Sequence, residues 1–383
     1  MKERIWTGPF VVAWCCSFGA ALAIHAFVHL PGLLKSWGAG ETVIGAVIAT
    51  TSLTAIVVRP AIGKWMDTRG RRTIAIAGAL IHVVACAAYL TVDKVGPWLL
   101  CVRALHGVAG AMLFSVYFTM AADMVPMRRR TEGIALFGVS GMLPVALGPL
   151  LGDLILRHAD YPTLFLVLTG IAVIGFAMTF ALRETRTAGQ ARAGLWAALK
   201  LPALLPLWML GTVLAIGITS FFVFLKTYAQ EESLGSISTF FTPFALTAVL
   251  LRVFAGWVPD RVGPRRALLP AMAVLLVGIV VLGAATAGWH VAMAGVLCGL
   301  GHGYVFPILS ALIIDRAPEG DRGAAVTLFT ALFDVGLLLG GPSLGWVIET
   351  WGYRAMFGAS ALVLVVGSLV FARWDRTEAG AAT

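Results

Sequence analysis

Long apolar runs separated by short polar stretches occupy almost the whole chain of 383 residues. A run of about 20 apolar residues is long enough to cross the hydrocarbon core of a bilayer as a helix. Six runs precede a polar stretch at 183–200, and six follow it. The runs lie at 10–34, 42–62, 73–92, 97–122, 131–156, 163–182, 203–228, 234–257, 267–287, 291–313, 324–348 and 354–373. The pattern predicts an all-α membrane protein with twelve transmembrane helices.

The composition excludes the main alternatives to a membrane protein. Hydrophobic residues make up 59% of the chain and charged residues 12%, whereas soluble domains have about 45–50% and about 25%. A soluble enzyme, a disordered protein and a disulfide scaffold are therefore excluded. The sequence has no GxxxxGK[ST] signature for nucleotide binding, and no nucleophile has a neighbouring base. We expect no enzymatic activity and no cofactor.

The basic residues are divided unequally between the two ends of the predicted spans. Of 28 Lys and Arg residues, 20 lie in loops on the side of the N-terminus and 4 in loops on the opposite side. Short cytoplasmic loops carry the excess of Lys and Arg, so we expect a multi-pass protein of the cytoplasmic (inner) membrane with both termini in the cytoplasm. The charge of +9 follows these loops, which favours membrane lipids rather than nucleic acid as partners.

The two halves of the chain repeat each other at an offset of 193 residues. The first motif, Arg59, Gly63, Asp67, Gly70 and Arg72, recurs as Arg252, Gly256, Asp260, Gly263 and Arg265. A second motif, Gly148, Pro149 and Gly152, recurs as Gly341, Pro342 and Gly345. The repeat predicts two pseudo-symmetric six-helix bundles at 1–183 and 203–383, joined by a cytoplasmic linker at 184–202. Parallel repeats of this kind place a substrate site between the halves, near the middle of the membrane.

The motifs resemble those of a known transporter family. The stretch from Gly63 to Arg72 is similar to the loop signature G-x3-D-R/K-x-G-R-R/K of the major facilitator superfamily, and the copy beginning at Gly256 matches it as well. Arg103-x-x-His106-Gly resembles the fourth-helix motif of that family, with His in place of Gln. Gly148-Pro149-x-x-Gly152-Asp153 resembles the fifth-helix motif of its proton-driven antiporters. The chain is similar to bacterial drug and arabinose efflux permeases, which implies the fold of that superfamily and alternating access.

The loop signature has two interpretations. The resemblance implies a conformational latch at the cytoplasmic face, formed by Gly63, Asp67, Gly70, Arg71, Arg72, Asp123 and Arg59, with a copy formed by Gly256, Asp260, Gly263, Arg265, Asp315 and Arg252. We expect a loop of about ten residues, in which Gly63 and Gly70 supply close approach and positive φ. Asp67 is expected to cap the third span or to accept from Arg71 or Arg72. The alternative is a turn that only stops insertion and sets orientation.

The Gly-Pro motifs are steps of small residues with a proline bend. Such steps let helices pack closely and flex. The resemblance implies gate helices at Gly148, Pro149, Gly152, Gly341, Pro342 and Gly345. Plain packing is the alternative interpretation.

Ionisable side chains within the spans are candidates for proton coupling, because they are costly in a membrane. Asp334 lies near the middle of the eleventh run, where a carboxyl group is a candidate proton carrier. Arg103 and His106 share a face of the fourth run, and the resemblance implies that Arg103 handles protons. The alternatives are a structural partner for a basic residue at Asp334 and a snorkelling arginine at Arg103.

Further polar residues are candidates for the substrate cavity. His25 and His29 lie one turn apart and can change charge near neutral pH, but no HExxH pattern surrounds them, so we predict no metal site. Lys226 and Asp153 lie near the outer ends of their runs. Ordinary core packing, snorkelling and an exposed helix-end charge are the respective alternatives.

The sequence favours a monomeric secondary transporter that exports a small organic or amphipathic molecule in exchange for protons. Uptake or facilitated transport of an organic anion is the first alternative. Within the spans, the basic residues Arg103 and Lys226 outnumber the acidic Asp334, which suits an anionic substrate. A non-transporting membrane sensor with the same fold is a remote alternative.

Overall fold

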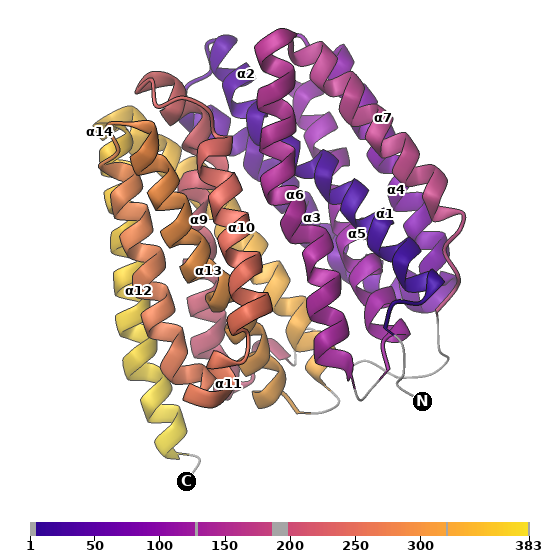
Figure 1. Cartoon of the computed structure of the whole chain (residues 1–383), viewed down its shortest axis with the longest axis vertical. Helices are drawn as coiled ribbons and strands as arrows, with labels where there is room; N and C mark the ends of the chain where they lie inside the picture. Colours follow the sequence, from indigo (N-terminus) through magenta and orange to yellow (C-terminus); the bar gives the residue numbers. More distant parts are fainter. Residues whose placement is uncertain (1–4, 127–128, 186–197, 319–320, 382–383) are drawn as a thin grey trace. The chain divides into compact units, whose positions relative to one another are not determined.

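A computed structural model describes residues 5–126, 129–185, 198–318 and 321–381. The described residues contain helices and turns but no strand, which confirms the all-α prediction. The long helices are shown in Figure 1. They are α1 (Gly8–Ala26), α3 (Glu41–Arg69), α4 (Arg71–Ala88), α5 (Pro97–Met124), α6 (Arg130–His158), α7 (Tyr161–Thr179), α9 (Leu205–Glu231), α10 (Ser238–Ala255), α12 (Pro264–Gly283), α13 (Gly288–Arg316) and α14 (Arg322–Ala381). The short helices are η1 (Phe27–His29), α2 (Leu30–Ser36), η2 (Tyr89–Thr91), η4 (Pro202–Leu204) and α11 (Val258–Val262).

Eleven helices in the described part of the chain are long and apolar enough to cross a membrane. The difference from the twelve predicted spans lies in α14, whose apolar part at 324–375 has 52 residues. A straight helix of that length would measure about 78 Å, more than twice the hydrocarbon core. Gly352 has non-helical backbone angles (φ 83°, ψ 173°) inside α14. This break separates the two runs predicted at 324–348 and 354–373.

The first of two compact units comprises the described residues within 1–37 and 53–189. In this unit α1 packs against α5, α6 and α7, and α4 packs against α5 and α7. Small and medium side chains fill its core, among them Ala13, Ala75, Met112, Val116 and Met120, each at most 3% exposed. Small residues allow close approach of helices in a membrane, where apolar burial alone gives little driving force.

The second unit comprises the described residues within 38–52 and 190–383. Here α9 packs against α14, and α13 packs against α10 and α12. The first twelve residues of α3 belong to this unit, while the rest of the same helix belongs to the first. The bundle boundaries predicted at 183 and 203 stay a prediction. Residues 38–52 lie before residue 183 in the sequence but group with the second unit.

The turn between α3 and α4 is shorter than expected. α3 continues to Arg69 and α4 begins at Arg71, so Gly70 alone forms the turn, with φ +91°. Gly263 has φ +98° at the equivalent position before α12. Only glycine adopts such angles readily, which explains both copies. The expectation of positive φ at Gly63 is wrong, because the helix simply runs through that residue.

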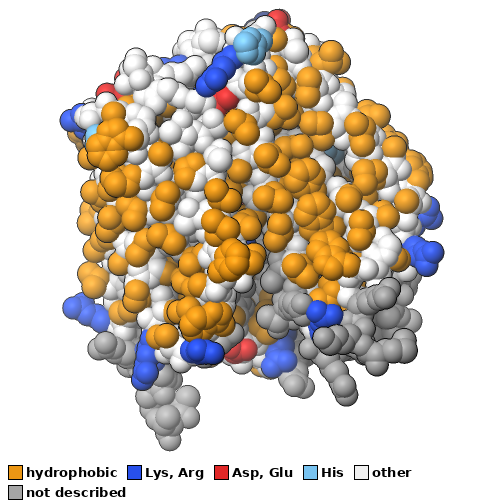
Figure 2. Space-filling view, viewed as in Figure 1, with side chains coloured by type: hydrophobic (Ala, Val, Ile, Leu, Met, Phe, Trp, Pro, Cys, Tyr) orange, Lys and Arg blue, Asp and Glu red, His pale blue; other side chains and the backbone are white. Residues whose placement is uncertain are grey.

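The outer surfaces of the helices are apolar. Figure 2 shows hydrophobic side chains along the helices and several Lys and Arg side chains near one end. Large apolar residues within the spans are widely exposed, such as Val57 at 69%, Leu166 at 62% and Phe254 at 72%. Exposed apolar surface on this scale fits a lipid environment, since soluble monomers rarely expose large contiguous apolar patches.

Candidate functional site

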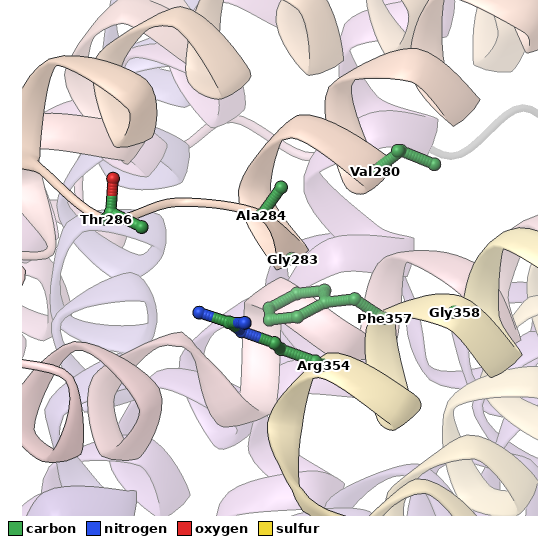
Figure 3. A pocket seen from close by; sticks show the side chains of 7 residues that line it. All are labelled: Val280, Gly283, Ala284, Thr286, Arg354, Phe357 and Gly358. Carbon is green, nitrogen blue, oxygen red and sulfur yellow. The ribbon is translucent and has the colours of Figure 1, made fainter.

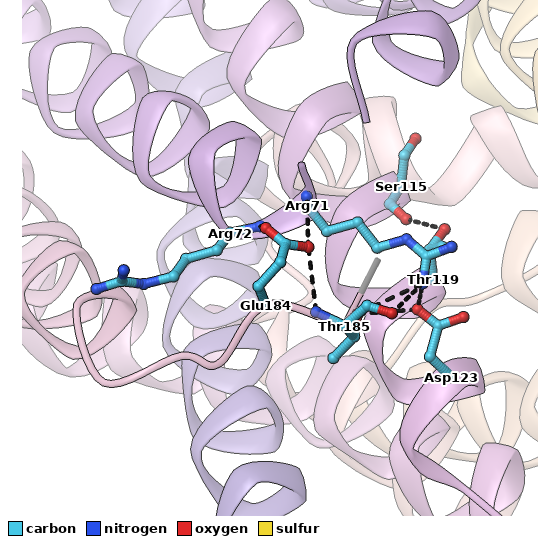
Figure 4. A network of polar contacts seen from close by, with 7 residues as sticks. All are labelled: Arg71, Arg72, Ser115, Thr119, Asp123, Glu184 and Thr185. Carbon is cyan, nitrogen blue, oxygen red and sulfur yellow. Dashed lines mark hydrogen bonds and ion pairs between the residues drawn. The ribbon is translucent and has the colours of Figure 1, made fainter. Parts of the chain in front are cut away.

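A polar network joins three segments of the first unit where the sequence predicts a latch (Figure 4). Arg71, at the start of α4, forms an ion pair with Asp123, near the end of α5. The hydroxyl of Thr185 donates a hydrogen bond of 2.9 Å to the same Asp123 carboxylate. Arg71 is 8% exposed, whereas the Asp123 side chain is 21% exposed, so the pair joins a buried cation to a carboxylate that water still reaches. The structure thus brings Arg71 and Asp123 together, as expected from the motif.

The start of α4 receives its cap from a residue outside the motif. The backbone N–H groups of Arg71 and Arg72 donate to the two oxygens of Glu184, over 3.0 and 3.1 Å. A carboxylate satisfies the unpaired N–H groups of a helix start and complements its dipole. The cap expected from Asp67 is therefore provided by Glu184, and Asp67 lies exposed in the last turns of α3. Gly63 and Arg59 lie further back in α3, in and next to the turn that contains Pro60.

The second copy of the motif uses a different carboxylate. Asp375, in α14, is 1% exposed and accepts from Arg265 at 2.8 Å and from Arg316 at 2.5 Å. Asp315, the predicted partner, is exposed and forms no ion pair with another described residue. The side chain of Asp260 lies outside the described part of the structure.

Arg252 and Gly256 belong to the same copy but contact other groups. The Nε of Arg252 donates to the carbonyl of Gly303 in α13, over 3.2 Å. Gly256 is the residue that ends α10, with ordinary negative φ. Arg252 therefore ties α10 to α13 rather than to an acidic partner of the loop.

The first Gly-Pro motif packs α6 directly against the end of α1. A Cβ atom added at Gly148 would lie 2.8 Å from the backbone nitrogen of Ala26, and one at Gly152 would lie 2.2 Å from the ring of His29. Pro149 provides the carbonyl that accepts from His29 Nε2, over 2.9 Å. The glycines are thus required for a close helix contact that also holds a titratable side chain.

The second Gly-Pro motif packs α14 against the start of α3. A Cβ atom at Gly345 would lie 2.4 Å from the carbonyl oxygen of Glu41, and one at Gly341 would lie 2.6 Å from that of Gly45. Pro342 lies between them in the helix. Here the close contact is with backbone, so no side-chain rotation could relieve an added methyl group.

Two of the candidate proton carriers lie together in the first unit. His29 is fully buried and Asp153 is 8% exposed, and His29 Nε2 lies 3.9 Å from Asp153 Oδ1. Because a carbonyl only accepts, the bond to Pro149 requires a proton on Nε2. The hydroxyl of Tyr161 donates to the backbone carbonyl of His29 over 3.3 Å. The sequence placed His29 and Asp153 on separate runs, and the fold makes them neighbours.

Arg103 and His106 share a second buried cluster, on α5. The hydroxyl of Tyr89 lies 3.2 Å from Arg103 Nη1 and 3.3 Å from His106 Nδ1. The ring of His82, from α4, lies 5.2 Å from that of His106. Arg103 is 5% exposed and both histidines are at most 4% exposed. His82 therefore belongs to a polar cluster inside the first unit.

The remaining candidates occupy separate places. Asp334 is half-buried on α14, and Lys226 is half-buried near the end of α9. His25 is half-buried on α1, and its backbone carbonyl carbon faces Gly148. No three His, Cys, Asp or Glu side chains in the described residues are arranged to hold a metal ion.

A comparison with protein families identifies the family of this chain. The sequence model of the Major Facilitator Superfamily matches residues 10–241 and 207–382. The chain belongs to the major facilitator superfamily. The resemblance found from the motifs is thereby confirmed, and the chain is a transporter rather than an enzyme.

Similar proteins lie at low identity but over nearly full length. The multidrug resistance protein MdtG of Salmonella typhi is 24% identical over 95% of this chain and 94% of that protein. The staphylopine export protein of Staphylococcus aureus is 24% identical over 91% of each chain. Among solved structures, the nucleoside transporter NupG superposes with a TM-score of 0.81 at 12% identity, over 96% of this chain and 100% of that chain. The human organic anion transporter MFSD10 gives 0.75 at 17%, over 94% and 98%.

Besides Asp375, sequence reasoning missed a second buried carboxylate in the described part of this superfamily member. Glu41, the first residue of α3, is 2% exposed. Tyr353 donates to it over 2.6 Å and Thr227 over 3.1 Å, from α14 and α9. Glu41 directly precedes the apolar run at 42–62, where a charged residue is typical of an ordinary helix end. A polar residue at the edge of a run, opposite a small-residue motif, was the available signal.

Proposed function

We propose that this superfamily member exports a small organic or amphipathic molecule in exchange for protons. The proposal places the chain in the cytoplasmic membrane, with both termini in the cytoplasm, and has the two repeats alternate between access to either side. It includes a monomeric functional unit, because each repeat provides its own gate helix. Two of the similar proteins are named for multidrug resistance and for export, which supports outward transport.

The observation that carries proton coupling is the contact of His29 with Asp153 next to Gly152. A charge within a span is costly unless it is paired. Arrival or loss of a proton at this pair changes the interaction at the surface where α6 approaches α1 most closely. A group that titrates at a tight helix contact can bias which packing is favoured.

Asp334 is proposed as the corresponding carboxyl group of the second repeat. It lies half-buried near the middle of the first helical part of α14, between Gly336 and the preceding Phe333. Added Cβ atoms at Gly336 and Gly340 would lie 2.5 Å from the carbonyl of Thr212 and 2.8 Å from the hydroxyl of Thr219. Gly336 and Gly340 therefore pack α14 closely against α9, while Asp334, two residues before Gly336, lies on a different face of the same helix turn.

Transport into proteoliposomes under an imposed pH gradient tests the proposal. A panel of organic cations, zwitterions and anions is presented, and an internal pH-sensitive dye records the accompanying proton flux. We expect Asp153→Asn and Asp334→Asn each to reduce proton-driven flux at least about tenfold while binding of the transported compound persists. Asp315→Asn, an exposed carboxyl group, is the matched control. Undiminished pH-driven transport by Asp334→Asn would exclude its role as carrier.

Uptake or facilitated transport of an organic anion is the second candidate. It is favoured by the buried cluster around Arg103, which presents a guanidinium group, two imidazoles and a phenol inside the first unit. Anions are recognised by such donor sets. The direction of flux decides between the candidates, since an exporter moves the compound against the imposed proton gradient and a symporter moves it with that gradient.

A non-transporting sensor is the remote third reading. It predicts no flux for any compound of the panel, with ligand-dependent thermal stabilisation retained. A thermal-shift screen against metabolites, drugs and metal chelates would identify the ligand in either case.

A further inference from the structure

A small groove opens between α12 and α14 at the end of the spans that carries few basic residues. Its volume is about 350 Å³. Its walls include Val280, Gly283, Ala284, Thr286, Arg354 and Phe357. Figure 3 shows the Arg354 and Phe357 side chains side by side on α14, with Ala284 and Thr286 on the segment that follows α12. All of these residues belong to the second unit.

The groove has an apolar inner part and a polar mouth. Val280 and Gly358 lie within the helical parts of α12 and α14, whereas Thr286 lies between α12 and α13. Arg354 lies two residues after the break at Gly352. The order along both helices therefore runs from apolar to polar as the spans end.

Tryptophans place this region at the membrane–water boundary. Trp289 is 64% exposed and Trp351 is 61% exposed, and both lie close in sequence to the mouth of the groove. Exposed tryptophans concentrate at the level of the lipid headgroups. Val280, at 52% exposed, lies three residues before the end of α12, on the hydrocarbon side of that level.

Arg354 supplies an exposed cation at the mouth of the groove. Its side chain is exposed, and it forms no hydrogen bond or ion pair with any residue that the structure describes. It is one of four basic residues in the predicted loops of this end, with Lys35, Lys94 and Arg157. A guanidinium group binds phosphate oxygens with two parallel hydrogen bonds.

The inner wall of the groove is rigid. Phe357 is 1% exposed, and its ring packs edge to face on Tyr228 with centroids 5.0 Å apart. A Cβ atom at Gly283 would lie 2.6 Å from the Cβ of Phe357. The hydroxyl of Tyr228 donates to the carbonyl of Leu282 over 3.1 Å. The groove is thus preformed and requires no rearrangement to accept an acyl chain.

We propose that this groove binds an anionic glycerophospholipid of the surrounding membrane. The phosphate group contacts Arg354, the glycerol region lies near Thr286, and an acyl chain lies along Val280 and Phe357. The site is independent of the transported compound and does not rest on proton coupling. It links the end of α12 to the second helical part of α14.

Native mass spectrometry of the purified full-length protein tests the site. Phosphatidylglycerol and phosphatidylcholine are titrated separately against the parent chain, Arg354→Gln and Arg157→Gln. We expect tighter binding of phosphatidylglycerol than of phosphatidylcholine by the parent chain, lowered about fivefold by Arg354→Gln. Arg157→Gln, which removes another basic residue of the same end, is expected to bind as the parent does.

A second variant fills the groove without touching the charge. Gly358 lines the groove, and a Cβ atom added there meets no other atom within 4 Å, so Gly358→Leu is designed to extend a side chain into the groove. We expect this variant to lose phosphatidylglycerol binding while its lipid-free thermal stability is no lower than that of the parent. Inorganic phosphate at millimolar concentration is expected neither to bind detectably nor to displace the lipid.

Three results would overturn the proposal. They are unchanged lipid binding by Arg354→Gln and Gly358→Leu, an equal loss in Arg157→Gln, and displacement of the lipid by inorganic phosphate alone. The first result would show that the lipid does not bind in this groove. The second would show that binding depends only on the total charge of this end. The third would show that the site binds a free anion rather than a lipid.

Discussion

The two repeats surround different titratable side chains with equivalent residues. In the first repeat, Gly152 and Tyr161 contact His29, through a close approach to its ring and a hydrogen bond to its carbonyl. In the second repeat, the equivalent Gly345 and Tyr353 contact Glu41, through its carbonyl and its carboxylate. A small residue and a phenol are thus kept in both copies, while the partner changes from an imidazole to a carboxylate.

The two Gly-Pro motifs pack against different helices. The first motif meets the end of α1, and the second meets the start of α3. The first contact buries an imidazole beside Asp153, and the second buries a carboxylate between two hydroxyl groups. The two copies therefore share the small residue and the phenol, and differ in the helix they pack against and in the polar side chain buried there.

The loop networks differ in the same manner. Arg71 of the first repeat has Asp123 as its acidic partner, whereas Asp375 of the second is shared by Arg265 and Arg316. A shared carboxylate retains one partner when the other is removed. The second network should therefore tolerate single substitutions better than the first.

The largest expected loss of stability comes from glycine substitutions in the two Gly-Pro motifs. Gly345→Ala should destabilise the protein by about 2–3 kcal/mol, because its methyl group meets the backbone of Glu41. Gly152→Ala should cost less, about 1–2 kcal/mol, because its methyl group meets the ring of His29 rather than backbone, and the ring can shift only by giving up its bond to Pro149. Gly358→Ala, where a Cβ meets nothing within 4 Å, controls for the general gain in helix propensity. Thermal unfolding in one detergent measures all three, and equal losses at Gly345 and Gly152 would contradict the comparison.

The loop networks give the next largest difference. Arg71→Ala should cost about 1–2 kcal/mol, because it leaves Asp123, whose side chain is 21% exposed, with the hydroxyl of Thr185 but without its cation. Arg265→Ala should cost less than about 1 kcal/mol, since the Arg265 side chain is 40% exposed and Arg316 still pairs with Asp375. Thermal unfolding of the single variants and of Arg265→Ala with Arg316→Ala measures this. A double variant no less stable than Arg265→Ala would show that Asp375 needs neither partner.

The two tyrosines provide a smaller and more local comparison. Tyr353→Phe removes a donor to a buried carboxylate at 2.6 Å, which should cost about 1.5–2 kcal/mol. Tyr161→Phe removes a neutral bond of 3.3 Å from a half-buried residue, which should cost about 0.5 kcal/mol. A cycle with Glu41→Gln isolates the first interaction. If Tyr353→Phe is equally destabilising in the parent and in Glu41→Gln, the bond to the carboxylate is not its source.

Local sequence patterns predicted the parts of this molecule that depend on neighbours along the chain. The apolar runs gave the helices, and the offset repeat gave the turn glycines Gly70 and Gly263. The pairing of Arg71 with Asp123 was also expected, because the family motif links them. Each of these depends on spacing that is visible in one stretch or in a known motif.

Partners that come from distant helices were beyond that reasoning. Glu184 caps α4 from 112 or more residues away, and Asp375 replaces Asp315 although both are ordinary helix-end carboxylates. Glu41 meets Tyr353 across 312 residues. Which helix end lies beside which is a property of tertiary packing, and no periodicity within a run encodes it.

The smallest expected change in stability concerns the start of the helix that follows each Gly-Pro motif. Asp160 caps α7 by accepting from the backbone and hydroxyl of Thr163, over 2.9 and 2.7 Å. These bonds hold the pKa of this exposed carboxyl group below its usual value, so its contribution is present above about pH 4 and is lost as the pH falls through the lowered pKa. Asp160→Asn keeps the cap without the charge, whereas Asp160→Ala removes both.

At neutral pH we expect a small loss of thermal stability in Asp160→Ala and a smaller but measurable loss in Asp160→Asn, which lacks the charge. As the pH falls below about 4, the gap between the parent and Asp160→Asn should close from the parent's side. The second repeat has Gly352 at the equivalent position, with φ 83° and ψ 173°, where a side chain is strained. Gly352→Asp should therefore destabilise rather than create a second cap. A stabilised Gly352→Asp would show that the break in α14 is adaptable and that the two repeats could share one way of starting their last helix.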